Sequence, residues 1–303
     1  MQTQRQIRQD ITNRIVSAIE SGIRPWKRPW RLSKNAGRPT NVVSKKPYSG
    51  VNTLLLELTS MQRNFSSKWW GTFKQWDSLG GCHVQKRPDN VPPGQWGTSI
   101  VFCKPINKTV TDDETGEEEE QGFFMLKTYT VFNADQVSGA ERFQVHEEPG
   151  SGNSEPDYSP AEELIAASGA DIRHGGERAF YSTGGDYIQL PNRERFGSVG
   201  AYYETAIHEL AHWSEPRQHF DRQELGYPMC ELIAEMASCF LASEIGIPNG
   251  EGLENHASYI RSWLDAMRGD SGFIFRASKL AGATTDFLMG FVREPEPEEA
   301  LVV

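Results

Sequence analysis

The sequence lacks several features that mark common classes of protein. It has only four cysteines in 303 residues, Cys82, Cys103, Cys230 and Cys239, and no CxxC pair. This excludes a disulfide-stapled scaffold and a cysteine-ligated zinc site, and fits reduced core residues of a cytosolic protein. No apolar run approaches the roughly 20 residues of a membrane span, and no apolar targeting segment follows the first residues. We therefore expect a cytoplasmic protein without membrane contact.

Recognisable nucleic-acid motifs are also missing, with no RNP-type string and no phosphate-cradling glycine loop. The net charge of −10 is, however, divided unevenly. Residues 1–108 hold 18 lysines and arginines against 5 acids, a net charge of +13, whereas the remainder carries −23. The same basic half contains six of the eight tryptophans. Cations that follow phosphates and rings that stack on unpaired bases predict binding of single-stranded nucleic acid.

Two segments of the basic half carry most candidate contacts. Prolines preclude a regular helix in 24–31, which is expected to be an extended arm of rings and cations. Residues 45–52 form a turn before an apolar helix. Trp69, Phe73 and Trp76 recur at helical spacing and are expected to form a core face, with Trp70 facing solvent. The alternative is a solvated arm and turn that bind nothing. The candidate DNA contacts are Arg24, Trp26, Lys27, Arg28, Lys45, Lys46, Tyr48, Asn52, Trp70 and Lys74.

The most specific motif in the chain is His208-Glu-Leu-Ala-His212. On a helix, imidazoles at i and i+4 lie one turn apart on one face, and the carboxylate of Glu209 can reach a water on the same metal. Ser198 and Pro216 suit the start and end of that helix. The motif predicts a zincin site with His208 and His212 as ligands and Glu209 as general base. The alternative is a surface helix with two incidental histidines.

A zincin site needs a third protein ligand, and Glu231 is the best candidate. Glu231 and Glu235 lie one turn apart in an apolar segment at 228–245, where two carboxylates would be costly without a cation. We predict that Glu231 binds the metal and that Glu235 accepts the second ring N–H of a ligand histidine. Zn²⁺ is the expected ion, and Mn²⁺ or another divalent ion also suits this set. The alternative places both glutamates on a solvated helix face.

Two features of the predicted cleft stay open. The side chain that stabilises the oxyanion could be Tyr227, Tyr259 or His256, although a structural role is the simpler explanation for each. The strand-like run 187–190 could align a peptide substrate as an added strand, or be a plain core or edge strand without substrate contact.

The organisation of the chain predicts an α+β fold with two domains, each with its own core. Residues 1–146 are expected to form an α+β domain, 147–160 a linker, 161–293 a mainly helical zincin-like domain and 294–303 a disordered tail. An acidic run at 111–121 is expected to be a solvated loop. Helices are predicted at 3–21, 53–62, 68–79, 160–168, 199–214, 228–245, 252–267 and 272–291, and strands at 98–105 and 122–132.

The chain resembles the ArdC-type antirestriction proteins of conjugative plasmids and the N-terminal regions of TraC-type plasmid primases. The resemblance rests on Pro25–Trp26, Tyr48–Leu56, Trp70–Trp76, Gly80–Gly81, Tyr129–Asn133, Tyr203–Trp213, Glu231–Glu235 and Tyr259–Trp263. It implies a bacterial, plasmid-encoded protein with an N-terminal single-stranded DNA-binding domain and a C-terminal metallopeptidase domain. Its implied role is to protect incoming DNA from host restriction.

Three functions follow from these expectations. The leading one is a DNA-binding metallopeptidase with an unidentified protein substrate, of which a host restriction component is one candidate. The second is a non-catalytic protein that coats single strands or masks restriction enzymes and holds a structural metal. The third is a DNA-tethered protease that acts on DNA-bound proteins.

Overall fold

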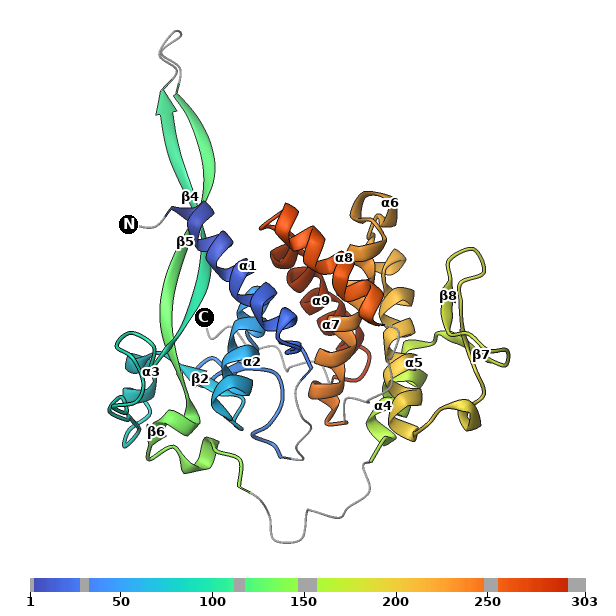
Figure 1. Ribbon diagram of the computed structural model, residues 1–303, viewed down its shortest axis with the longest axis horizontal. Coiled ribbons are helices and arrows are strands. Elements are labelled where there is room, and N and C mark those ends of the chain that lie inside the picture. Colours follow the sequence, from blue (N-terminus) through green and yellow to red (C-terminus); the bar gives the residue numbers. More distant parts are fainter. Residues whose placement is uncertain (1–2, 28–32, 112–117, 147–156, 248–255, 294–303) are drawn as a thin grey trace, which may run out of the picture.

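The structure, a computed structural model, describes residues 3–27, 33–111, 118–146, 157–247 and 256–293 (Figure 1). The predicted linker, the C-terminal tail and Arg28 fall wholly or largely outside these ranges. The fold class is confirmed, because a mixed N-terminal half precedes a mainly helical C-terminal half. The helices are α1 (Gln4–Glu20), α2 (Val51–Arg63), α3 (Phe73–Asp77), α4 (Ser159–Ser168), α5 (Val199–Ser214), α6 (Arg222–Leu225), α7 (Tyr227–Ile245), α8 (His256–Gly269) and α9 (Phe273–Met289).

The N-terminal sheet has the strand order β1-β2-β5-β4. Strands β1 (Thr40–Asn41) and β2 (Trp69–Gly71) are parallel, and the other neighbours are antiparallel. Strands β4 (Thr98–Thr111) and β5 (Glu118–Asn133) form a hairpin that extends well beyond the helices in Figure 1. Both strands are longer than predicted. Glu118–Glu120 belong to β5 and pair with Thr109–Thr111 of β4, so the acidic run is not a loop throughout. A small sheet pairs β3 (His83–Val84) with β6 (Val137–Ser138).

The helix predicted at 68–79 is wrong, because the chain forms β2 and then the short helix α3. Thr72 caps α3: its hydroxyl accepts from the Gln75 amide, and the Gln75 side chain accepts from the Thr72 amide. Gly71 permits the close approach of β1, since a Cβ there would lie 2.8 Å from Val42 Cγ1. A strong local cap thus overrides the helical spacing of the aromatic residues.

One hydrophobic cluster joins the two halves, and further clusters lie within each half. In one cluster, Ile15 and Ile19 of α1 and the arm residue Trp26 pack with residues of α7, α8 and α9, including Trp263. Outside this cluster, the buried Arg38 forms ion pairs with Glu244 (2.9 Å) and Asp286 (3.0 Å) near the ends of α7 and α9. The N-terminal segment is therefore anchored directly to α7, the helix that carries the predicted ligand Glu231.

The remaining C-terminal elements pack around α5 and α7. A second core cluster joins α4, α5 and α9 to strand β9 (Tyr187–Leu190). Strand β9 lies between β7 (Asp171–His174), to which it is parallel, and β8 (Phe180–Ser182), to which it is antiparallel. None of the helices in the described ranges is long and apolar enough to cross a membrane.

Candidate metal centre and nucleic-acid interface

Helix α5 presents both histidines of the HExxH motif on a buried face. Ser198 begins the helix, since its hydroxyl accepts a hydrogen bond from the Ala201 amide at 3.1 Å. Further along the helix, His208 and His212 are 9% and 5% exposed, with ring centroids 4.9 Å apart. The i and i+4 spacing thus places two nitrogen ligands side by side.

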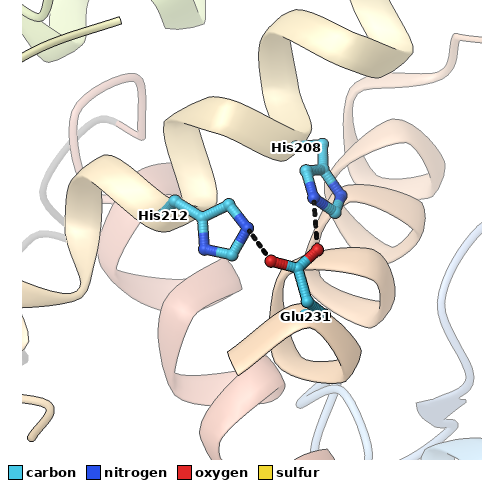
Figure 2. A group of neighbouring side chains, drawn as sticks. All are labelled: His208, His212 and Glu231. Carbon is cyan, nitrogen blue, oxygen red and sulfur yellow. Dashed lines mark ion pairs between the residues drawn. The ribbon is translucent and has the colours of Figure 1, made fainter. Parts of the chain in front are cut away.

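Helix α7 brings the carboxylate of Glu231 between the two rings, as Figure 2 shows. Its oxygens lie 3.7 Å from His208 Nε2 and 3.5 Å from His212 Nε2. One ligand atom from each residue lies within 4.8 Å of the others. Two ligands of a tetrahedral zinc ion are about 3.4 Å apart when each bond is about 2.1 Å long. The spacing and the His₂Glu donor set therefore fit a divalent ion.

These residues line an open cleft of about 480 Å³, which also contains Glu209. Glu209 is 8% exposed and follows the ligand His208 directly on α5. Burial raises the pKa of Glu231, but the two histidines lower it more strongly and hold it well below its usual range. The Glu231 carboxylate is thus ionised at neutral pH, as a metal ligand must be.

His212 should make the stability of the metal-free protein depend on pH. Burial lowers its pKa, but hydrogen bonds with Glu215 and Glu231 raise it to about 9. The stabilisation is fully present below the unfolded pKa of about 6.5 and is lost as the pH rises through the folded value. We expect the Tm of the chelator-treated protein to fall over this window, with a weaker slope in His212→Gln. Identical slopes in thermal denaturation would contradict this prediction.

The carboxylate that orients His212 is Glu215, a residue the sequence analysis missed. Its Oε1 accepts a hydrogen bond from His212 Nδ1 at 2.7 Å, and its Oε2 pairs with Arg222 at 2.8 Å. Glu235, predicted for this role, instead accepts a hydrogen bond from Trp26 Nε1 at 3.4 Å. Glu235 lies one turn beyond Glu231, where the N-terminal arm crosses α7. The i, i+3 spacing from His212 was a signal that could have indicated Glu215.

The edge strand beside the cleft is β8, not β9. Because β9 pairs with strands on both sides, it cannot receive a peptide as an additional strand. Phe180 and Tyr181 of β8 line the cleft, and Phe180 is 40% exposed. Tyr227 and Tyr259 also line the cleft, and their hydroxyls are 2.7 Å apart. Burial, Tyr259 and Glu231 raise the pKa of Tyr227, which keeps its proton. The side chain of His256 lies outside the described part.

Comparisons with known proteins cover both halves of the chain. Residues 5–132 match the N-terminal domain of anti-restriction factor ArdC, and residues 159–280 match a zincin-like metallopeptidase family. The uncharacterised protein y4eC of Sinorhizobium fredii is 33% identical over 82% of this chain and 80% of its own length. The crystal structure of metal-free ArdC from plasmid R388 has a TM-score of 0.74 and 32% identity, and covers 94% of this chain and 97% of that one. The chain belongs to the ArdC family.

A second structure of the R388 protein and one further relative also match this ArdC-family chain. The Mn(II)-bound structure of the R388 protein has a TM-score of 0.70 and 31% identity, over 95% of this chain and 98% of that one. DNA primase TraC of Escherichia coli is 34% identical over 86% of this chain, which spans only 25% of the primase. The ArdC-type fold therefore occurs both alone and as a part of larger proteins.

Several residues predicted to contact DNA are instead buried or hydrogen-bonded within this ArdC-family protein. Trp26 and Trp70 are 2% and 0% exposed, so the prediction that they stack on bases is wrong. The Asn52 side chain bonds the amide and carbonyl of Val101 at the outer edge of β4. Tyr48 is half-buried and its hydroxyl accepts from Asn41 Nδ2 at 3.0 Å. The Trp26 and Trp70 rings pack in the hydrophobic core, because large aromatic side chains bury the most apolar area.

The arm cations face the metallopeptidase half. Arg24 lies 4.0 Å from Glu235 of α7, and Lys27 lies 3.5 Å from Glu204 of α5. Both cations are about three-quarters buried. Their charge therefore offsets buried carboxylates within the protein.

An exposed basic surface remains on and beside α3. Lys45, Lys46 and Lys74 are exposed, and the Lys45 ammonium lies 4.5 Å from the Trp69 ring centroid. Asn41 and Gln75 bond to one another and hold the 41–46 turn against α3. Phe73, predicted to be a core residue, is 59% exposed next to Lys74. The Thr72 cap was the signal that could have placed Phe73 outside the core.

Proposed function

We propose that this ArdC-family protein is a metallopeptidase that also binds single-stranded DNA and protects incoming plasmid DNA from host restriction. One observation carries the peptidase part: His208, His212 and Glu231 converge within 4.8 Å in an open cleft that also contains Glu209. A structural zinc site would have four protein ligands and no cleft, whereas three ligands leave a position for water or substrate.

Each side chain has a role in this reaction. A bound divalent ion, zinc by family or manganese as in the R388 relative, would supply a Lewis acid and an acidic water. Glu209 takes the proton of the attacking water and later gives it to the leaving amine. The protonated Tyr227, with Tyr259 as its hydrogen-bond partner, donates to the oxygen of the scissile carbonyl.

The substrate is an extended peptide that pairs with the free edge of β8. This edge borders the cleft, and its backbone groups offer the alternating donors and acceptors that an added strand uses. Phe180 and Tyr181 supply apolar contacts along the same edge.

Metal removal tests the peptidase proposal. An unfolded protein such as reduced casein is incubated with the chelator-treated chain, then with added Zn²⁺ or Mn²⁺, and new termini are identified by mass spectrometry. Cleavage should appear only after metal addition, because the scissile carbonyl is polarised by the ion that the two histidines and Glu231 hold. Absence of cleavage with either ion, at demonstrated occupancy, would contradict the proposal.

For the DNA part, we place the contact on the basic α3 surface formed by Lys46, Phe73 and Lys74. Phe73→Ala should weaken binding of a single-stranded oligonucleotide by about 1–3 kcal/mol, the usual stacking contribution of one ring. Replacing both lysines with alanine should reduce the slope of log K against log[salt] by about 1.4, since each phosphate contact contributes about 0.7. Lys279→Ala, on the exposed side of α9, is the matched control. Unchanged affinity and slope, measured by fluorescence anisotropy, would place the DNA elsewhere.

A further inference from the structure

Glu215 is an acid buried directly behind the proposed metal centre. It is 1% exposed and follows the last residue of α5, where Pro216 starts a short turn. Its two oxygens have different partners: Oε1 accepts from His212 Nδ1 at 2.7 Å, and Oε2 pairs with Arg222 Nη1 at 2.8 Å. A buried carboxylate is costly unless both oxygens are compensated, and here a ring N–H and a guanidinium compensate them.

The two proposed ligand histidines differ in how they are held. With a metal bound, a hydrogen bond from Nδ1 to Glu215 would fix the ring plane and the tautomer of His212 and leave the Nε2 lone pair for the ion. His208 Nδ1 is buried and has no hydrogen-bond partner among the residues that the structure describes. Within the described part of the chain, a carboxylate therefore orients His212 but not His208.

Arg222 connects this arrangement to the cleft. It begins α6, which Asp221 caps, and its side chain is 33% exposed and lines the cleft. Its guanidinium lies against the Glu215 carboxylate behind His212. With a metal bound, the neutral His212 ring would be polarised toward the ion, because a carboxylate acceptor at Nδ1 makes the opposite ring nitrogen more basic.

We propose that Glu215, supported by Arg222, is the positioning residue for His212 and sets the metal affinity of this site. The inference rests on the proposed metal centre. It assigns this role to a residue three positions after the second histidine of the motif, on the same stretch of chain, and not to Glu235 on the following helix.

The test compares two buried carboxylates by isosteric substitution. In Glu215→Gln the charge is lost with little change in volume, and we expect Zn²⁺ affinity to fall about 10–100-fold, measured by competition with a chromophoric chelator. Glu235→Gln, equally buried at 2% exposure, is the matched control and should keep the wild-type affinity. The Co²⁺ ligand-field spectrum supplies a second readout, which we expect to change in Glu215→Gln and to match the wild type in Glu235→Gln.

Each outcome has a distinct meaning. Wild-type affinity in a folded Glu215→Gln, or an equal loss in Glu235→Gln, overturns this inference and leaves the proposed peptidase intact. Failure of the unaltered chain to bind Zn²⁺ or Co²⁺ overturns the proposed metal centre itself. Should Glu215→Gln not fold, Glu215→Asp takes its place, because it keeps the charge but withdraws the carboxylate by one methylene. Reduced Zn²⁺ affinity supports the inference in that variant, and wild-type affinity overturns it.

Discussion

Glu209→Gln should lower the rate of peptide cleavage by about 10²–10⁴-fold while the protein keeps its metal. The reason is that Glu209 lines the cleft next to the ligand set but is not one of the three converging residues. Glutamine preserves the shape of the side chain but cannot take a proton from water. Cleavage rates and bound metal, measured on the same preparation, check both halves of the prediction. Glu163→Gln, on the exposed side of α4, is the surface control and should cleave at the wild-type rate.

The same variant separates the proposed peptidase from a binding-only protein. In a conjugation assay with a restricting recipient, loss of protection in metal-loaded Glu209→Gln would tie protection to catalysis. Full protection by a cleavage-deficient variant would assign protection to the basic half, with the zincin-like half as a scaffold. Cleavage that requires single-stranded DNA would favour a protease acting on DNA-bound proteins.

Trp70→Ala should destabilise the protein by about 3–5 kcal/mol, the usual cost of truncating a buried large aromatic side chain. Trp70 is fully buried in a cluster with Leu56, Ile100 and Val131. The rings of Trp70 and Phe65 pack edge to face, with their centroids 5.9 Å apart. Truncation would leave a cavity between α2 and the sheet, which the long β4–β5 pair cannot easily close.

Urea denaturation measures this loss, and Phe73→Ala supplies the comparison. Phe73 is 59% exposed, so its removal should leave the free energy of unfolding nearly unchanged while weakening DNA binding. The reverse pattern, with Trp70→Ala stable but unable to bind DNA, would restore Trp70 as a base-stacking residue and contradict its burial.

Local patterns in the sequence predicted the helices that carry the metal centre. The spacing of His208 and His212 and the flanking Ser198 defined α5, and Gly246 ends α7 in a left-handed conformation. These features depend on neighbours within a few residues, so they can be predicted without knowledge of the fold. Glu231 was also within reach, because an acid in an apolar helix needs a cation to compensate its burial.

The same reasoning failed where a residue's environment comes from distant parts of the chain. Trp70 and Phe73 exchanged their expected places because Trp70 pairs with Asn133 in the sheet, a contact between positions far apart in sequence. Trp26, expected to stack on bases, instead packs against Trp263 with ring centroids 6.1 Å apart. Composition indicated cations and rings in the basic half but not which of them face solvent.

By itself, the sequence determined the helix periodicity and the uneven charge of this protein, and it predicted the ligand types and the general base of the proposed site. Only the tertiary structure decided that one hydrophobic cluster joins the two halves, that β9 is an inner strand, and that Glu215 is the hydrogen-bond partner of His212. The physical reason is the range of the interactions. Helix spacing and capping act over a few residues, whereas burial, strand order and the partner of a buried charge depend on how distant segments pack.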